Sequence, residues 1–209
     1  MSRYISEAVI RRLPIYYRHL RDLEQAGVQQ ISSQELGEQM QLTPSQIRQD
    51  INSFGGAGRQ GYGYQVHELR EHIQGVLGLN REHRMVILGA GRMGQAVANY
   101  AIFAKEGFRT VALFDSDARK VRRKEGTIPI YPVEELPERV PELKADIAVL
   151  AVPASEAQQL LDQVYGLGIR AIWNFAPLDL SYPEDMVVVN VHMSDTLGIL
   201  SYLMSQQEG

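Results

Sequence analysis

The stretch Gly89-Ala90-Gly91-Arg92-Met93-Gly94 decides the fold of the second half of this 209-residue chain, because it has the spacing G-x-G-x-x-G. The four apolar residues 85–88 before it predict a buried strand, and residues 95–105 after it predict a helix. A strand, a glycine turn and a helix form the context in which this motif predicts dinucleotide binding. The first glycine permits the turn, the second lets a pyrophosphate approach the backbone, and the third lets the helix pack on the strand.

A second strand, residues 110–114, ends in Asp115, which lies 21 residues after Gly94. An acid at this distance is placed to hydrogen-bond the ribose 2'-hydroxyl of the nucleotide. The basic run at residues 119–124 is an alternative clamp for the 2'-phosphate of NADP, but Asp115 would repel that phosphate. We therefore expect the cofactor NAD(H) rather than NADP(H).

The alternation of strand and helix continues to the C-terminus. Strands are expected at residues 128–131, 146–152, 169–174 and 186–191, a helix at 155–165, and an amphipathic helix at 194–204. This pattern predicts an α/β fold, a Rossmann-like domain with a doubly wound parallel sheet, whose ligand lies beyond the carboxyl ends of the strands. The strand ends that would line one dinucleotide are Gly89 to Gly91, Asp115, Val152-Pro153 and Asn174 to Pro177.

We call the glycine motif at residues 89–94 the fingerprint. The residues before it predict a separate, mostly helical domain. Residues 7–26 have the apolar spacing of a helix, and Pro14 is expected to kink or break it. Residues 66–77 predict another helix, and 78–84 a linker. The expected domains are therefore an N-terminal domain at 1–79, a nucleotide-binding domain at 80–191 and a C-terminal segment at 192–209.

Two capping motifs follow each other within the N-terminal domain. Ser32 and Glu35 have the spacing of a capping box, and Thr43 to Gln46 repeats that spacing with a proline at the first helical position. Gln46 is expected to reach back to the cap, and its helix to run from Pro44 to about Phe54. Two short successive helices predict a helix-turn-helix.

The second of these helices carries Ile47 and Ile51 on one face, which leaves polar side chains elsewhere. Arg, Gln and Asn have the donors and acceptors that read base edges in a DNA major groove, although a solvated polar face has the same composition. The candidate DNA-binding residues of this helix are Ser45, Arg48, Gln49 and Asn52.

A glycine-rich segment, residues 54–64, follows that helix and carries Arg59 near its middle. Its glycines, and the aromatic residues after them, predict a hairpin that looks like the wing of a winged-helix domain. Arg59 is then expected to enter a minor groove. A nucleotide-binding loop is the competing interpretation, but no strand followed by a helix frames these glycines.

The amino-acid composition excludes several kinds of site and partner. The chain has no cysteine, which excludes disulfides, thiolate metal ligands and thiol-based redox sensing, and no metal site is predicted. Residues 1–84 carry 10 Arg, no Lys and 9 acids, whereas residues 85–209 carry 11 basic and 16 acidic residues, so an anionic partner suits the first part better. Without a signal peptide or an apolar run near the roughly 20 residues that span a bilayer, a soluble, cytoplasmic protein with no membrane partner is expected.

An enzyme that transfers hydride needs a proton donor beside the substrate carbon, and Tyr100, Tyr131 and His192 are the candidates. None of them lies in a recognisable catalytic signature. The 125 residues after position 84 suffice for a dinucleotide-binding domain but leave no room for a substrate domain. A binding domain without catalytic residues is therefore preferred, and a small NAD-dependent oxidoreductase is the alternative.

Over nearly its whole length the chain resembles Rex, a family of bacterial redox-sensing transcriptional repressors. The glycine fingerprint alone is a weak sign, but its combination with the predicted wing and with Asn-Phe-Ala-Pro is specific. The motifs that carry the resemblance are residues 12–18, Ser32-Ser33, residues 47–50, Phe54-Gly55 with Gly61 to Tyr64, the fingerprint at Gly89, Phe114-Asp115, Ala151 to Pro153 and Asn174 to Pro177.

The resemblance implies a homodimer with swapped C-terminal helices at 192–209, which binds a pseudo-palindromic operator in double-stranded DNA. NADH in both subunits releases the operator, whereas NAD+ permits binding. Arg48 is then expected in the major groove, Arg59 in the minor groove, and Arg18 at an interface that changes between the two states. The implied cofactor-binding residues are Gly89, Ala90, Gly91, Arg92, Met93, Gly94 and Asp115 at the adenosine and pyrophosphate, and Tyr100, Val152, Pro153, Asn174 and Phe175 toward the nicotinamide.

Two positions depart from the pattern of the family. Gln49 stands where members commonly have Lys, and His192 stands where they commonly have Asp at the head of the C-terminal helix. In the family those charges couple the nicotinamide state to the domain angle, so a rewired or weakened switch is expected. Since histidine titrates between about pH 5 and 8, release by NADH is expected to depend on pH, unless His192 is merely packed at the dimer interface. A paralogue with an altered or lost NADH response, or one that takes CoA, also stays open.

Overall fold

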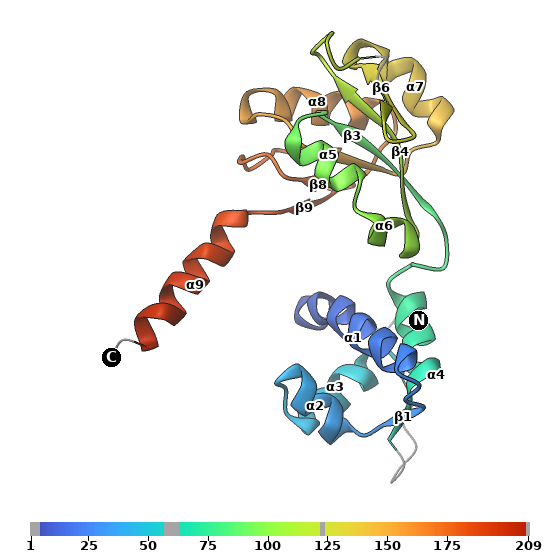
Figure 1. Ribbon diagram of the computed structural model, residues 1–209, viewed down its shortest axis with the longest axis vertical. Helices are drawn as coiled ribbons and strands as arrows, with labels where there is room; N and C mark the ends of the chain where they lie inside the picture. Colours follow the sequence, from blue (N-terminus) through green and yellow to red (C-terminus); the bar gives the residue numbers. More distant parts are fainter. Residues whose placement is uncertain (1–4, 57–62, 122–123, 208–209) are drawn as a thin grey trace. The chain divides into compact units, whose positions relative to one another are not determined.

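The structure is a computed structural model that describes residues 5–56, 63–121 and 124–207. The chain divides into two compact units, residues 1–81 and 82–209 (Figure 1). Within the described ranges, no helix is both long enough and apolar enough to cross a membrane.

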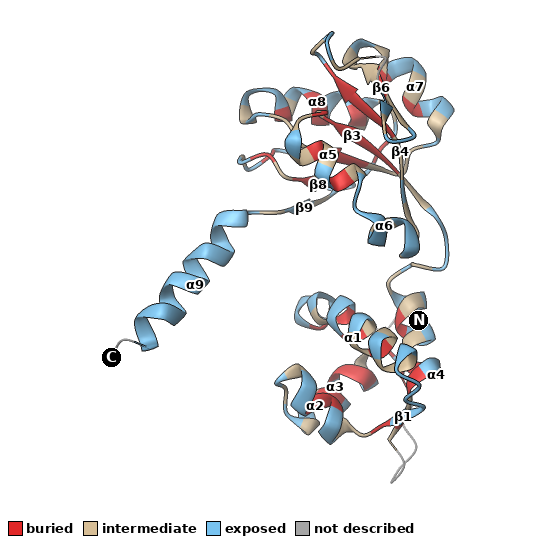
Figure 2. Cartoon of the chain, viewed as in Figure 1, coloured by how far each residue is buried: buried red, intermediate tan, exposed pale blue. Residues whose placement is uncertain are grey.

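The N-terminal unit packs its helices around one apolar core. In the described residues its elements are α1 (Glu7–Gln25), β1 (Gln30–Ile31), α2 (Ser33–Met40), α3 (Pro44–Ser53), β2 (Tyr64–Gln65) and α4 (Val66–Val76). Each helix contributes buried side chains, among them Leu13, Leu36, Ile51 and Ile73 (Figure 2). The helix-turn-helix and the winged-helix arrangement expected from the sequence are confirmed in this part of the chain.

The expected hairpin of the wing is paired differently from the prediction. Strand β2, which follows the glycine-rich segment, pairs antiparallel with β1 ahead of the helix-turn-helix, so that Gln30 lies opposite Gln65. Phe54 and Gly55, directly after α3, belong to a turn, and Gly56 belongs to no strand. Arg59 and the rest of residues 57–62 lie outside the described residues.

The two capping motifs of the helix-turn-helix have different outcomes. Ser32 Oγ accepts the backbone N–H of Glu35, and the Glu35 carboxylate accepts the backbone N–H of Ser32, so the first capping box is confirmed. Thr43 caps α3 by accepting the backbone N–H of Gln46. The predicted return contact of Gln46 is wrong, because its side-chain amide donates to Asp50 one turn further on, at 2.7 Å.

Pro14 does not break α1, so of the expected kink or break the break is wrong. It lies on the exposed side of the helix, whereas Leu13 and Tyr16 are buried in the core. The carbonyl that loses its helical partner at a proline can therefore bond to water. Packing of the apolar face holds the helix together across this position.

The C-terminal unit contains, in the described residues, a sheet in the order β5-β6-β4-β3-β7-β8-β9. All neighbouring strands are parallel except the short β5–β6 hairpin at one edge. Without β5 this is the strand order 3-2-1-4-5-6 of dinucleotide-binding folds, which confirms the doubly wound sheet. The strands are β3 (His83–Leu88), β4 (Phe108–Asp115), β5 (Lys124–Glu125), β6 (Ile128–Pro132), β7 (Ile147–Leu150), β8 (Ala171–Asn174) and β9 (Val187–Asn190).

Helices cover both faces of this sheet. Side chains of α7 and α8 pack against Leu88 and Phe114 on one face, and those of α5 and α6 pack against Ile87 and Leu113 on the other. The helices are α5 (Arg92–Ala98), α6 (Ala101–Lys105), α7 (Leu136–Leu143) after a 3-10 turn at Val133–Glu135, α8 (Ala154–Gly166) and α9 (Met193–Gln207). The sequence analysis did not predict α7 or β5.

The single helix expected at residues 95–105 is divided into α5 and α6. Asn99 ends α5, and its side-chain amide donates to the carbonyl of Gln95 and to the carboxylate of Glu125. Tyr100 then adopts an extended conformation before α6 begins. A polar side chain that bonds to its own helix end thus interrupts the predicted helix.

One part of the sheet is left without a covering layer in the single chain. Residues 175–186, all of them described, contain no helix between β8 and β9. On the face opposite α8, Val187 and Val189 are 64% and 55% exposed and lie beside Ala171 and Trp173. Helix α9 likewise has no buried residue in the described chain (Figure 2).

Candidate functional site

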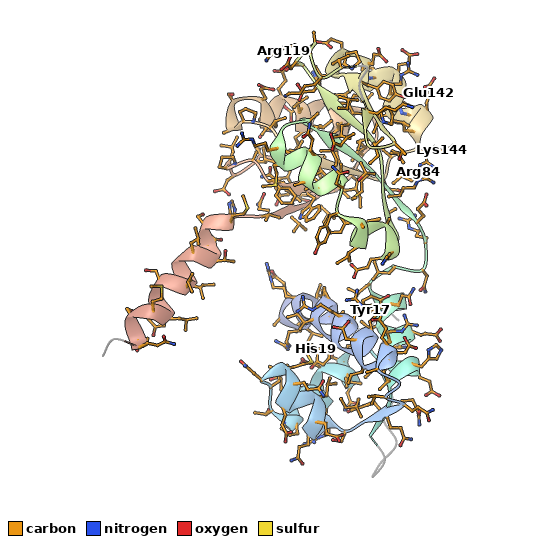
Figure 3. All side chains as sticks on the ribbon, viewed as in Figure 1. Tyr17, His19, Arg84, Arg119, Glu142 and Lys144 are labelled. Atoms are coloured by element: carbon orange, nitrogen blue, oxygen red, sulfur yellow. The ribbon has the colours of Figure 1, made fainter. Side chains whose placement is uncertain are left out.

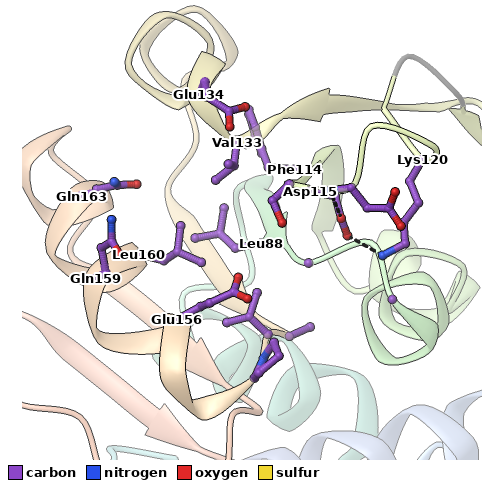
Figure 4. A pocket seen from close by; sticks show the side chains of 17 residues that line it. Leu88, Phe114, Asp115, Lys120, Val133, Glu134, Glu156, Gln159, Leu160 and Gln163 are labelled. Atoms are coloured by element: carbon purple, nitrogen blue, oxygen red, sulfur yellow. Dashed lines mark hydrogen bonds and ion pairs between the residues drawn. The ribbon is translucent and has the colours of Figure 1, made fainter.

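A cavity of about 740 Å³ opens at the carboxyl ends of β3, β4 and β7 (Figure 4). Side chains of α8 and of the turn after β6 complete its walls. This is the edge at which a doubly wound sheet binds its ligand. Five of the sequence-predicted cofactor residues line the cavity: Gly89, Gly91, Asp115, Val152 and Pro153.

The three glycines of the fingerprint have different structural reasons. Gly89 has a φ of +100°, and a Cβ there would press against the carbonyl of Ala151. A Cβ on Gly94 would collide with the carbonyl oxygen of Gly89, so the close packing of α5 on β3 requires glycine. Gly91 has an ordinary φ of −78°, and a Cβ there would have no atom of the described chain within 4 Å. The fold explains the first and third glycines, whereas the second one borders open space in the cavity.

The other residues of the fingerprint support this loop. Ala90 is fully buried, and Met93 is half-buried against the sheet. Arg92 is exposed at the first residue of α5. These positions place a cation and the first backbone N–H groups of a helix beside Gly91, as pyrophosphate binding requires.

Asp115, at the end of β4, has a carboxylate that is 9% exposed and held by three donors. Its Oδ2 accepts the backbone N–H of Ala90 at 2.7 Å and the ammonium of Lys120 at 3.0 Å. Its Oδ1 accepts the backbone N–H of Asp117 at 2.8 Å. The carboxylate therefore joins the glycine loop to the end of β4 and faces the cavity (Figure 4).

Most of the charged side chains on the cavity wall are acidic. Asp115, Asp117, Glu134 and Glu156 line it, and Lys120 is the one cation among its described lining residues. Hydrogen bonds from Arg119 lower the pKa of Asp117 to about 2, so this carboxylate is ionised at neutral pH. An additional phosphate on the ribose would therefore meet like charge.

Asn174 does not line this cavity, although the sequence places it toward the nicotinamide. Its side chain is fully buried and forms hydrogen bonds with other groups of the protein. Oδ1 accepts the backbone N–H of Ala176, and Nδ2 donates to the carbonyl of Leu178 and to Oδ1 of Asn190. The Asn174 amide thereby fixes the loop after β8.

Tyr100 and Phe175 also lie outside the cavity lining. They are the ends of a series of aromatic contacts that runs from Tyr100 through Phe103 and Trp173 to Phe175, with ring centroids 4.6 to 5.4 Å apart. Tyr100 is 52% exposed. The structure thus brings Gly89, Gly91 and Asp115 together with Val152 and Pro153 in one cavity and leaves Tyr100 and Phe175 on a separate aromatic surface.

On α3 the candidate DNA-binding residues share an exposed face. Ile47, Asp50 and Ile51 are buried, whereas Ser45, Arg48, Gln49 and Asn52 are exposed, as the sequence predicts. The guanidinium of Arg48 donates to Ser33 Oγ on α2 at 3.0 Å. Ser33, on the neighbouring helix, thus orients the guanidinium of Arg48.

Asp50 has a structural role that was not predicted from the sequence. This carboxylate is fully buried, and it accepts four hydrogen bonds, two from Arg12 and one each from Tyr16 and Gln46. Burial raises the pKa of Asp50, but the hydrogen bonds from Arg12, Gln46 and Tyr16 outweigh it and hold the pKa below its ordinary value. The available signal was an acid three residues after Ile47, on the apolar face of the helix.

The two candidate switch residues occupy different units. Arg18 is exposed on α1. His192 lies just before α9, with its Nε2 4.0 Å from Oδ1 of Asp179, a pair that is ionic only when the histidine is protonated. His192 thus lies near a carboxylate at the head of the terminal helix.

Comparison with known proteins gives matches over both units. A family model described as a putative DNA-binding protein N-terminus matches residues 4–52, and one described as a CoA binding domain matches residues 80–178. A redox-sensing transcriptional repressor Rex from Thermoanaerobacter sp. (strain X514) is 45% identical over 204 residues, which is 98% of this chain and 91% of the relative. The chain belongs to the Rex family.

Solved structures of a Rex-family repressor, RSP, agree with this assignment. RSP in complex with β-NAD+ and operator DNA is 45% identical, with a TM-score of 0.92 over 98% of this chain and 94% of RSP. RSP in complex with β-NADH is 43% identical, with a TM-score of 0.90 over 98% and 96% of the two chains. The resemblance to Rex inferred from the sequence is therefore confirmed, and the Rex relatives are named as repressors rather than as enzymes.

Proposed function

We propose that this Rex-family chain is a transcriptional repressor that responds to the ratio of NADH to NAD+. It binds a pseudo-palindromic operator in double-stranded DNA as a homodimer, and NADH releases it. One observation carries the proposal: the open space beside Gly91 and Asp115 in one unit accompanies an exposed base-reading face on α3 in the other. RSP supports the combination of a nucleotide site with a DNA-binding face, because its structures hold β-NAD+ with operator DNA or β-NADH.

The charges of the cavity favour NAD(H) over its phosphorylated analogues. Asp115 accepts hydrogen bonds, which suits a free ribose hydroxyl. The 2'-phosphate of NADP(H) and the 3'-phosphate of CoA would both approach this carboxylate and its acidic neighbours. We therefore assign NAD(H), with the adenosine half in the cavity and the nicotinamide toward Val152, Pro153, Asn174 and Phe175, with Tyr100 nearby.

The exposed face of α3 is assigned to the major groove. Arg48 is suited to guanine edges, and Gln49 and Asn52 to adenine edges, while Ser45 at the helix start suits a phosphate. Arg59 is assigned to the minor groove on the basis of the sequence. Ser33 supports the assignment of Arg48, because a guanidinium directed in advance loses less entropy on binding.

The homodimer is supported by two apolar surfaces that a single chain leaves open. One is the strip of sheet at Val187 and Val189, and the other is α9, whose Leu197 is 65% exposed. A helix of one subunit lying on the other subunit would cover both at once. We therefore assign residues 192–209 to a swapped dimerisation helix, residues 1–79 to DNA, and residues 80–191 to NAD(H), in a cytoplasmic protein.

The nucleotide site is assigned to sensing and not to catalysis. Of the three candidate proton donors, Tyr131 packs its ring against Phe114 and beneath the guanidinium of Arg139. The ring of Tyr100 packs against Phe103, and His192 lies near Asp179 just before α9. Turnover of NADH with small carbonyl compounds would contradict this assignment.

The test is a gel-shift titration of the full chain on a Rex-type palindrome, with NAD+, NADH, NADP+ and NADPH added in turn. We expect binding without nucleotide and with NAD+, and release by NADH at concentrations where NADPH has little effect. Absence of operator binding under every condition would overturn the proposed function. Release by all four nucleotides alike would contradict the sensing of redox state.

A further inference from the structure

Lys120 is the only cation among the described lining residues of an otherwise acidic cavity, and its ammonium lies at the carboxylate expected to bind ribose. Its Nζ is 3.0 Å from Oδ2 of Asp115, while the side chain is 36% exposed and so retains freedom to move. Neighbouring Arg119 is committed to Asp117, to which it donates from Nε at 2.9 Å and from Nη2 at 2.8 Å. Among the described residues that line the cavity, the ammonium of Lys120 is therefore the positive charge available at Asp115 (Figure 4).

We propose that Lys120 is a specificity-determining residue that makes the site tolerate a 2'-phosphate, so that it limits the discrimination between NADH and NADPH. The inference rests on the proposed binding of NAD(H). It assigns to Lys120 a role opposite to that of Asp115: the carboxylate selects the free hydroxyl, and the ammonium lowers the penalty for the phosphate.

The hydrogen-bond capacity of Asp115 explains how NADH fits with Lys120 in place. A carboxylate has about four acceptor positions, and Ala90, Asp117 and Lys120 occupy three of them. One ribose hydroxyl can donate to the remaining position without displacing the lysine. Binding of NADH is therefore expected to depend only weakly on Lys120.

A 2'-phosphate has no hydrogen to donate and needs a cation. The described cavity offers it the anions Asp115, Asp117 and Glu134, and one ammonium that can turn from Asp115 toward the phosphate. Removing the Lys120 ammonium leaves the repulsion between the phosphate and the carboxylates but removes the attraction between the phosphate and the cation. One net hydrogen bond to a charged group changes affinity by about tenfold.

The test compares the dissociation constants of NADH and NADPH for the full-length chain and for Lys120→Gln. Trp173 is the single tryptophan of the chain, and it lies in contact with Phe175. Its emission therefore reports on a dihydronicotinamide bound nearby, without DNA in the assay. We expect the ratio of the NADPH to the NADH dissociation constant to rise by about tenfold in Lys120→Gln, mainly through weaker binding of NADPH.

Lys144→Gln is the matched control, because it removes the same charge from the same unit. Lys144 is exposed beyond the end of α7, where the chain enters the amino-terminal end of β7, at the edge of the sheet opposite the cavity (Figure 3). The ratio should not change in this variant. An equal change in both variants would reduce the effect to net charge and overturn the inference.

The remaining outcomes are also decisive. Equal weakening of NADH and NADPH in Lys120→Gln would make the lysine a general anchor and overturn the inference. Failure of the unaltered chain to bind NADPH at a thousand times its NADH dissociation constant would overturn it too, because no tolerance would exist. Failure to bind NADH at all would instead overturn the proposed function.

Discussion

Arg12 on α1 and Asp50 on α3 form a two-pronged ion pair, in which Nε lies 2.7 Å from Oδ2 and Nη2 lies 2.8 Å from Oδ1. The Asp50 side chain is fully buried and that of Arg12 is 25% exposed. Tyr16 and Gln46 fill the other two acceptor positions of the carboxylate. The helix assigned to base reading is thus bonded from its buried side to the first helix of its own unit, because a planar guanidinium fixes orientation as well as distance.

Replacement of Asp50 by Asn should destabilise the N-terminal unit by about 3 kcal/mol, because it leaves Arg12 without its charge partner at a buried site. Urea unfolding followed by far-ultraviolet circular dichroism measures the change. Trp173 fluorescence reports on the other unit and should show an unchanged transition. Glu7→Gln is the control, since it breaks an ion pair with Arg11 whose two side chains are both 77% exposed. A similar loss in both variants would contradict the importance of burial.

The same carboxylate predicts a pH dependence of stability. The hydrogen bonds from Arg12, Gln46 and Tyr16 hold the folded-state pKa of Asp50 below its unfolded value, which is about 3.9. The stabilisation is therefore complete above that unfolded value and is lost as the pH falls through the lower, folded one. The difference in unfolding free energy between the unaltered chain and Asp50→Asn should be constant from pH 7 to about pH 5 and shrink in stronger acid. A difference that grows on acidification would contradict this sign.

The fingerprint glycines predict a separation of ligand binding from folding. Gly91→Ala should leave the thermal midpoint of unfolding unchanged, because the new Cβ meets no described atom. It should weaken NADH binding by at least about tenfold, because the methyl group keeps the pyrophosphate from the backbone. Gly94→Ala should instead destabilise the C-terminal unit by about 2 kcal/mol, because the carbonyl of Gly89 cannot move aside. Thermal unfolding and NADH titration of both variants measure these effects. Equal loss of stability in the two would contradict the assignment of Gly91 to the ligand.

Arg48→Ala should lower operator affinity by about 1 to 3 kcal/mol and weaken the preference for operator over unrelated DNA, because one bidentate base contact is lost. Ser33→Ala should cause a smaller loss of the same kind, since Ser33 only directs the guanidinium. Fluorescence anisotropy with both DNAs measures the two affinities. Lys144→Gln, which removes a charge from the other unit, should change neither. An equal loss of affinity for both DNAs in Arg48→Ala would assign the arginine to phosphate contact instead.

His192 predicts a weakened release of the operator by NADH, because it stands where members of the family commonly have a carboxylate. His192→Asp restores that carboxylate beside the head of α9, so less NADH should be needed for half-release than in the unaltered chain. Lys144→Gln, at an exposed site beyond α7, should leave the value unchanged. Gel-shift titration measures the half-release concentrations, and identical values for the unaltered chain and His192→Asp would refute the prediction.

The sequence predicted the fold well where a local pattern has one structural meaning. The apolar strand before Gly89 and the acid after the next strand identify a nucleotide-binding βαβ unit, and the capping residues Ser32 and Thr43 mark the starts of two helices. These features depend on contacts within a few residues or on a spacing that the fold itself imposes. The alternation of strands then determines the sheet order.

The errors arose where distant residues decide the outcome. Gln46 gives up its expected return contact because Asp50 offers a buried carboxylate, and Asp50 is buried only because Arg12 and Tyr16 reach it from another helix. Asn99 likewise interrupts a predicted helix with help from Glu125, 26 residues away. Propensity and periodicity contain no information on such partners.

The uncovered strip beside β9 has a consequence for how the chain survives in the cell. In the proposed homodimer, a newly made subunit would expose Val187, Val189 and the apolar side chains of α9 to water until it met another copy. Its resistance to unfolding would then be set by mass action, so that dilution would lower the melting temperature and abundance would raise it. The amount of repressor that a cell makes would then govern both occupancy of the operator and the lifetime of each molecule.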